Sequence, residues 1–137
     1  MKRITAIALL AVSSIAGIHS ASAQENAVQA TIPFNFTVNS KVLPAGPYRI
    51  TALSRNVVSI SNQEKNITVL SVSYAGDKQP GTPKLVFNRY GNQYFLSKII
   101  SPTASNCMDI PVSKLERRVR WQESRLHEGA QAVVALK

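Results

Sequence analysis

Residues 84–100 read KLVFNRYGNQYFLSKII, and this stretch carries the clearest fold signal in the chain. Two runs rich in β-forming residues flank Gly91-Asn92, a dipeptide that suits a two-residue hairpin loop. If the loop closes there, Phe87 lies opposite Leu96 in the paired strands. The stretch therefore predicts an antiparallel β-hairpin.

The same register places Leu85 opposite Lys98 and Arg89 opposite Tyr94. Successive residues of a strand point to opposite faces, and both faces of this hairpin are rich in apolar side chains. The expected core face carries Leu85, Phe87, Tyr94 and Leu96, and the other face carries Val86, Tyr90, Phe95 and Ile99. A hairpin that is apolar on both faces is either central in a sandwich or lines a site for an apolar ligand.

Further strands are expected before the hairpin. Residues 28–38 alternate strictly between apolar and polar side chains, which is typical of a half-buried strand. Pro33 cannot donate a backbone hydrogen bond, so one side of this strand is expected to be an edge or a bulge. A bulge near Val69-Leu70 is also expected, because the apolar phase shifts there. Shorter strands are predicted at residues 48–53, 57–61 and 67–74, with turns at 43–47, 54–56 and 62–66.

The first residues predict a processing signal. Residues 1–23 combine a basic start, a mostly apolar stretch and Ala21-Ser22-Ala23, an A-x-A cleavage pattern. The apolar stretch is too short and too interrupted to span a membrane, and no later segment approaches a span. The prediction is export to the periplasm or the medium after cleavage near Ala23; a short N-terminal helix is the alternative.

The charge balance favours an anionic partner. Without its first 23 residues the chain keeps 114 residues, and its formal charge falls from +9 to +7. Such an excess favours contact with an anionic envelope component such as phospholipid headgroups, with an acidic polysaccharide or with nucleic acid, although solubility alone is an alternative explanation.

A basic helix is predicted near the C-terminus. Ser113 and Glu116 fit a capping box, in which Glu116 reaches back to the cap. The expected apolar stripe consists of Val112, Leu115, Val119, Gln122 and Leu126. Whether this helix packs on the strands or projects from them stays open, and the last residues form either a loose tail or a short strand. The predicted segments are a signal peptide (1–23), a β-domain (24–112), a basic amphipathic helix (113–128) and a tail (129–137). Together they predict a mainly β fold, an antiparallel β-sandwich or barrel with one C-terminal α-helix.

Residues for catalysis or metal binding are scarce. Cys107 is the only cysteine, so it is either a buried thiol or a bridge between two copies in a homodimer. His127 is the one histidine after residue 23, and a nucleophilic pair with Cys107 has no identified orienting group. No spacing of ligands indicates a metal site, no cofactor motif is present, and the enzyme hypothesis is weak.

A candidate binding surface is predicted from basic and aromatic residues. Tyr90 and Phe95 are expected either to form a platform for stacking sugars or bases or to close a second core layer. Trp121, which lies off the apolar stripe, either widens the packed face or is an exposed anchor. The candidate residues are Arg89, Tyr90, Phe95, Lys98, Arg117, Arg118, Arg120, Trp121 and Arg125.

Two stretches resemble a known family. Residues 32–50 (IPFNFTVNSKVLPAGPYRI) and 84–99 (KLVFNRYGNQYFLSKI) resemble a family of small secreted bacterial proteins of uncharacterised function. Its members share the motifs I-P-F-x-F, L-P-A-G-x-Y and L-V-F-x-R-Y-G-x-x-Y-F-L, followed by a basic helix. The resemblance implies a signal peptide and a β-rich domain, and it brings no catalytic residues.

These observations favour an exported, non-enzymatic binding protein that contacts an anionic or glycan partner. Two alternatives stay open. The protein could be a structural or assembly protein that uses the helix as an interface with a partner protein, or it could carry a small apolar ligand between its sheets.

Overall fold

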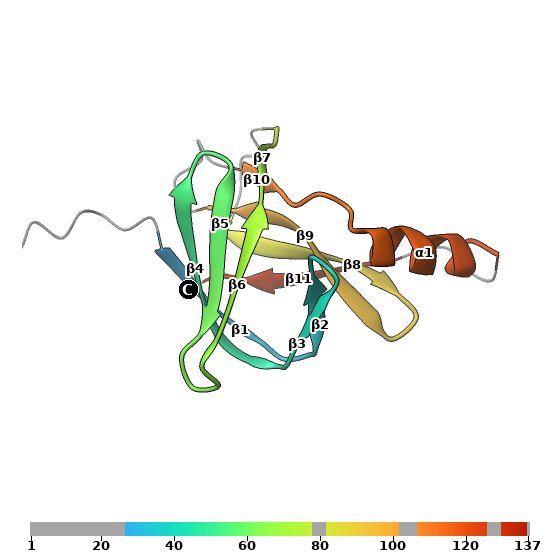
Figure 1. The fold of residues 1–137 in the computed structure, drawn as a ribbon, viewed down its shortest axis with the longest axis horizontal. Coiled ribbons are helices and arrows are strands. Elements are labelled where there is room, and N and C mark those ends of the chain that lie inside the picture. The colour runs from blue at the N-terminus through green and yellow to red at the C-terminus, as the bar shows by residue number, and fades with distance from the viewer. Residues whose placement is uncertain (1–26, 78–81, 102–106, 126–129, 137) are drawn as a thin grey trace, which may run out of the picture.

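The computed structural model describes residues 27–77, 82–101, 107–125 and 130–136. The predicted signal peptide, the leader that follows it, His127 and the predicted end of the helix lie outside these residues. Within them the protein is mainly β, with two largely antiparallel sheets and one helix near the C-terminus, which confirms the predicted fold class (Figure 1).

The first sheet has four antiparallel strands in the order β1-β4-β5-β6. Its strands are β1 (Ala27–Ile32), β4 (Gly46–Ser54), β5 (Val57–Asn62) and β6 (Ile67–Val72). In Figure 1, β4, β5 and β6 stand upright in front of the second sheet.

The second sheet follows the order β11-β8-β9-β10-β7, with the predicted hairpin at its centre. Its strands are β7 (Tyr74–Ala75), β8 (Lys84–Tyr90), β9 (Gln93–Ile100), β10 (Cys107–Asp109) and β11 (Ala130–Ala135). Beside it lie β2 (Phe36–Val38), which pairs in parallel with β9, and β3 (Lys41–Leu43), which pairs with β2. The last residues thus add a strand against β8, the second of the two alternatives for the C-terminus. The helix α1 (Lys114–Glu123) lies between β10 and β11 in the chain.

The two sheets share one core rather than closing into a barrel. Aromatic rings join them: Phe36 of β2 packs edge-on against Tyr48 of the first sheet at 5.0 Å between ring centroids and against Phe87 of the second at 5.5 Å. Phe34 stacks on Tyr94 at 4.0 Å. Burying such rings is the dominant favourable term for folding, so this cluster fixes how the sheets face each other.

The first predicted strand is divided in two. The apolar alternation continues from Ala30 and Ile32 to Phe36 and Val38, all buried, but the chain leaves the first sheet at Pro33 and enters the second. Pro33 has no backbone N–H to donate to a neighbouring strand, so the strand is interrupted at a position where it loses a hydrogen bond. The single strand expected at residues 28–38 is therefore corrected to β1 and β2.

A hairpin that the sequence analysis did not predict follows at Asn39-Ser40. Both residues have positive φ angles, 51° and 67°, as a type I′ two-residue loop requires. Asparagine adopts this conformation more readily than most residues, and the hairpin joins β2 to β3.

The central hairpin turns at Gly91-Asn92 as predicted, with Gly91 at φ 57°. The pairs Phe87–Leu96 and Arg89–Tyr94 are also confirmed. Between these pairs and the open end of the hairpin, however, the register shifts by one residue, because an extra residue of β9 is inserted there.

The extra residue is Ser97, and it corrects one predicted pair. Leu85 lies opposite Ile99 rather than Lys98, which pairs with Val86 instead. The shift also moves Ile99 from the outer face into the shared core. The hairpin is thus central in its sheet, and this placement accounts for its two apolar faces.

The bulge predicted near Val69-Leu70 is wrong. β6 pairs regularly with β5 along its whole length. Its buried positions include Ser71, whereas Leu70 and Val72 are exposed on the outer face of the first sheet. The apolar phase therefore shifted because a small polar residue occupies a core position, and not because the backbone is irregular.

Candidate functional site

The helix α1 begins at Ser113, as predicted. Ser113 has an extended backbone, and its Oγ accepts a hydrogen bond from the N–H of Glu116 at 3.1 Å. The Glu116 side chain departs from the predicted capping box, because its Oε1 accepts a hydrogen bond from Asn88 Nδ2 at 2.9 Å and a longer one from the Tyr90 hydroxyl at 3.4 Å. The carboxylate therefore attaches the start of the helix to β8.

One face of α1 packs on the hairpin. Glu116 and Val119 are buried, and Glu123, one turn further along the same face, is half-buried. A Cβ placed on Gly91 would lie 3.0 Å from the Glu123 Oε1, so the turn of the hairpin lies beside this carboxylate. The helix thus follows the hairpin to its tip.

The predicted apolar stripe of the helix is corrected by this packing. Of its members in the described part of the chain, Val119 is buried and Leu115 half-buried, whereas Val112 and Gln122 are exposed. The packed face is rotated relative to the predicted stripe, because the buried Glu116 takes a position that an apolar residue would ordinarily hold.

The opposite face of α1 is basic. Positions separated by three, four and seven residues share one side of a helix, and Lys114, Arg118 and Trp121 have this spacing. Arg125 follows the C-cap Ser124, and it joins this side because its guanidinium lies over the Trp121 ring. Arg117 lies beside them, one turn from Lys114. All five side chains are exposed, and both acidic residues of the helix lie on the packed face. We call these five residues the helix surface.

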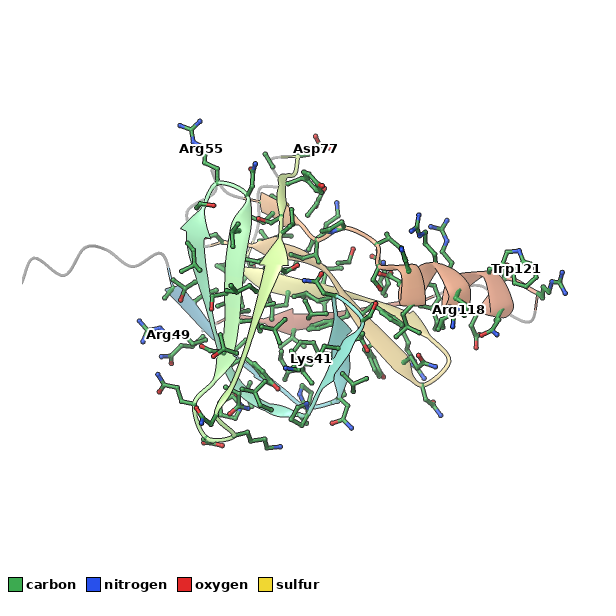
Figure 2. The ribbon with its side chains drawn as sticks, viewed as in Figure 1. Lys41, Arg49, Arg55, Asp77, Arg118 and Trp121 are labelled. Carbon is green, nitrogen blue, oxygen red and sulfur yellow. The ribbon has the colours of Figure 1, made fainter. Side chains whose placement is uncertain are left out.

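Trp121 is the most prominent member of the helix surface. It is 61 % exposed, and the Arg125 guanidinium lies over its ring, 4.1 Å from the centroid. Figure 2 shows Trp121 near the C-terminal end of α1. Of the two alternatives for this residue, the structure has the exposed one.

The predicted aromatic platform is absent from the surface. Phe95 is 2 % exposed, and its ring lies 5.8 Å from that of the half-buried Tyr90, on the face of the hairpin next to Glu116. Burial raises the pKa of Tyr90 above its usual value, and the Glu116 charge adds to this effect while the Arg120 charge opposes it. Tyr90 and Phe95 therefore form the second core layer.

Arg89 and Lys98 lie away from the helix surface. Arg89 is at the tip of the hairpin, where its Nε donates to the Gly91 carbonyl at 2.9 Å and its guanidinium lies 5.7 Å from the Tyr94 ring centroid. Lys98 lies near the open end of the hairpin, where its Nζ is 3.6 Å from the Asp109 Oδ1. The residues of the predicted binding surface therefore do not form one continuous surface.

The predicted binding residues on the helix do lie together on one side of it. Arg117, Arg118, Trp121 and Arg125 share the outward face, and Arg120 lies at its border, close enough to Tyr90 to influence its pKa. Lys114 belongs to the same face although it was not among the predicted residues. Helical spacing alone would have identified it, since it lies four residues before Arg118.

Cys107 is a buried thiol with an ordinary structural role. It is 5 % exposed, and a Cβ placed on Gly76 would lie 3.0 Å from its Sγ. Burial raises the pKa of the thiol, and the charge of Asp109 raises it further. A protonated, covered sulfur is a poor nucleophile, and it is poorly placed to bridge two copies.

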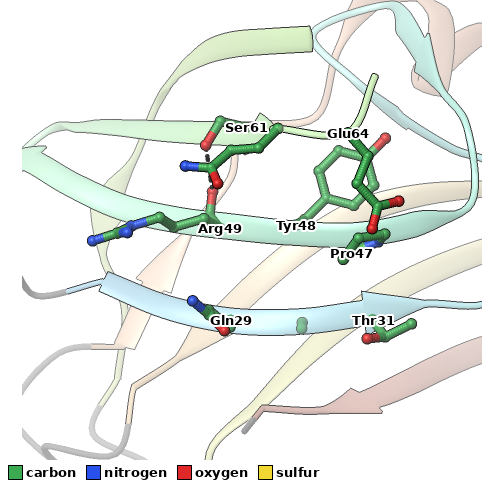
Figure 3. A pocket seen from close by; sticks show the side chains of 9 residues that line it. Gln29, Thr31, Pro47, Tyr48, Arg49, Ser61 and Glu64 are labelled. Atoms are coloured by element: carbon green, nitrogen blue, oxygen red, sulfur yellow. Dashed lines mark hydrogen bonds between the residues drawn. The ribbon is translucent and has the colours of Figure 1, made fainter. Parts of the chain in front are cut away.

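A shallow pocket of about 270 Å³ lies on the outer face of the first sheet, opposite the core (Figure 3). Gln29, Arg49 and Glu64 are among its lining residues, and Ser61 Oγ donates to the Arg49 carbonyl at 3.3 Å at one side. No sequence pattern predicts this pocket, because its polar side chains alternate like those of any solvated strand face. Its lining also includes Ala30, Pro47 and Tyr48, so polar and apolar groups both border it.

The described residues contain no group of His, Cys, Asp and Glu side chains that could hold a metal ion. Nor does that part of the chain include a helix of the length and apolarity needed to cross a membrane. Comparison with known proteins gives no match to a family model, to a curated protein or to a solved structure. The helix surface is therefore the candidate site, on the strength of its geometry and charge.

Proposed function

We propose that the protein is an exported, non-enzymatic binding protein that contacts an anionic partner through the helix surface. The observation that supports this proposal is the separation of charge on α1. Four cations and the only tryptophan of the chain share the outward face, while Glu116 and Glu123 both lie on the packed face. The predicted signal peptide and the resemblance to small secreted proteins support export.

The chemistry of the surface suits anionic groups. Three of its four cations are arginines, whose planar guanidinium groups hydrogen-bond phosphate, sulfate and carboxylate in pairs. The two carboxylates of α1, Glu116 and Glu123, lie on the packed face, so an anion that approaches the helix surface meets no acidic side chain of the helix. The formal charge of +7 after residue 23 would also attract such a partner over longer distances.

The experiment uses the chain from residue 24 onward and immobilised heparin as a model polyanion. Binding should be tight at low salt and should weaken steeply as ionic strength rises, because exposed charges are screened within about 8 Å at physiological salt. Binding that is absent at low salt, or that does not change with salt, would overturn the proposal.

A matched pair of variants tests where the contact lies. Arg117→Gln with Arg118→Gln removes two charges from the helix surface, and Lys41→Gln with Arg55→Gln removes two exposed charges elsewhere (Figure 2). The helix pair should bind heparin much more weakly than the control pair, which has the same net charge. Equal losses would mean that binding follows net charge alone.

A second candidate function is assembly with a partner protein. It is favoured by the exposed Trp121 next to Arg125, because tryptophan and arginine dominate the energetic centres of protein interfaces. An assembly interface centred on Trp121 should persist at high salt. Native mass spectrometry of the exported fraction would show it as a complex that Trp121→Ala dissociates, whereas a bare monomer would count against it.

A further inference from the structure

We infer that the anionic partner is the surface of a phospholipid bilayer, with Trp121 inserted at the level of the headgroups. This inference rests on the proposed function, since it names the partner of the same helix surface. It is carried by three features of α1: its convex outer surface, its combination of one aromatic ring with several cations, and its fixed attachment to the second sheet.

The first feature is shape. α1 lies at one end of the molecule, where it runs along the hairpin of the second sheet, and Trp121 is exposed near its C-terminal end (Figures 1 and 2). The buried contacts of the helix are at Glu116 and Val119. The helix surface is convex. The pocket described above lies elsewhere, on the outer face of the first sheet. A convex surface can touch a flat partner along the length of the helix, whereas it cannot enclose a small anion.

The second feature is composition. Tryptophan is favoured at membrane interfaces, where its ring lies among the headgroups, and arginine and lysine extend their charged ends to lipid phosphates. On α1 the Trp121 ring has Arg125 over it and Arg118 one turn before it. One aromatic ring gives little apolar area, so electrostatic attraction must supply much of the binding. The expected contact is peripheral, reversible and specific for anionic lipid.

The third feature is attachment. An isolated helix of ten residues is marginal in water. Here the Ser113 cap and the hydrogen bonds from Asn88 and Tyr90 to Glu116 hold α1 on β8. The helix surface is therefore formed before contact, and binding does not have to order it.

The experiment uses the chain from residue 24 onward with two kinds of vesicle, phosphatidylcholine alone and phosphatidylcholine mixed with phosphatidylglycerol. Because Trp121 is the only tryptophan, its fluorescence reports this position directly. We expect a blue shift with the mixed vesicles only, and quenching when their acyl chains are brominated near the headgroup. Binding without a blue shift or quenching would overturn the inserted position of Trp121.

Cosedimentation with the mixed vesicles measures the variants. Arg117→Gln with Arg118→Gln should weaken partitioning roughly 10- to 30-fold, and Lys41→Gln with Arg55→Gln much less. Trp121→Ala should also weaken it, whereas Trp121→Phe should retain part of the affinity. Equal effects of the two charge pairs would overturn the lipid contact at this surface.

Heparin binding separates the two levels of the argument. If the chain binds heparin but not the mixed vesicles, the lipid inference is wrong and the proposed function stands. If it binds neither, both are wrong. If neutral vesicles bind it as well as the mixed vesicles do, the anionic headgroup is not what the surface recognises.

Discussion

The two faces of α1 differ in almost every respect although they belong to a helix of ten residues. The inward face uses a buried carboxylate, Glu116, and a valine to hold the helix on β8. The outward face carries exposed cations around the exposed Trp121. Substitutions on the inward face should therefore change stability, and substitutions on the outward face should change binding.

The largest effect is expected in the layer beneath the helix. Phe95→Ala removes a ring that is 2 % exposed, and it should lower the free energy of unfolding by about 3–5 kcal/mol. Urea denaturation followed by circular dichroism measures this. Heparin binding per folded molecule should stay unchanged, and a loss below 1 kcal/mol would mean that α1 does not cover this ring in solution.

A smaller loss is expected at the carboxylate that attaches the helix. Glu116→Ala leaves the Asn88 amide and the Tyr90 hydroxyl without their acceptor and should lower the free energy of unfolding by about 1–3 kcal/mol. Glu116→Gln keeps an acceptor oxygen and serves as the matched control, with a smaller loss expected in the same urea titration. If both variants had the same free energy of unfolding as the parent chain, these hydrogen bonds would not contribute to stability.

Alkaline pH should lower the free energy of unfolding, because it ionises two groups that are covered in the folded state. The pKa of Tyr90 and the pKa of Cys107 are raised above 10.0 and 9.0, mainly by burial, so the folded state keeps protons that the unfolded chain loses. The stability from each group is complete below its unfolded pKa and is lost as pH rises through its folded pKa. Urea midpoints should therefore fall above about pH 9.

The control for this pH dependence is Tyr90→Phe, which removes one of the titrating groups. Its urea midpoint should decline less steeply above pH 10 than that of the parent chain. An identical decline would show that Tyr90 titrates alike in the folded and unfolded states.

The smallest effect on stability is expected at the outward face. Trp121→Ala should change the free energy of unfolding by no more than about 0.5 kcal/mol, because the ring is 61 % exposed. The same variant should bind anionic vesicles more weakly. A loss of stability comparable with that of Phe95→Ala would show that Trp121 packs on the fold, which would contradict the division of α1 into two faces.

Local signals predicted much of this fold. The turn at Gly91-Asn92 and the cap at Ser113 were predictable because each depends on a few adjacent residues. The pairing of Leu85 was not, because the insertion of Ser97 leaves the apolar pattern acceptable in either register. The predicted bulge in β6 is wrong for a similar reason, because the buried Ser71 interrupts the apolar pattern without interrupting the strand.

The candidate site shows the same limit. Helical spacing was enough to gather Arg117, Arg118 and Trp121, because a helix relates residues that are close in sequence. It could not show that Phe95 is buried or that Lys98 lies elsewhere, because both depend on which elements cover each face of the hairpin. The chemistry within one element was thus predictable, and the association between elements was not.

The most direct test of the account is a map of where the partner touches the molecule. Backbone amide shifts and the Trp121 indole N–H shift can be followed by nuclear magnetic resonance while a short heparin oligosaccharide is added to the chain from residue 24 onward. We predict that the changes gather at the helix surface, on Lys114, Arg117, Arg118, Trp121 and Arg125. Changes that gather instead around Arg49 and Glu64 on the outer face of the first sheet would contradict it.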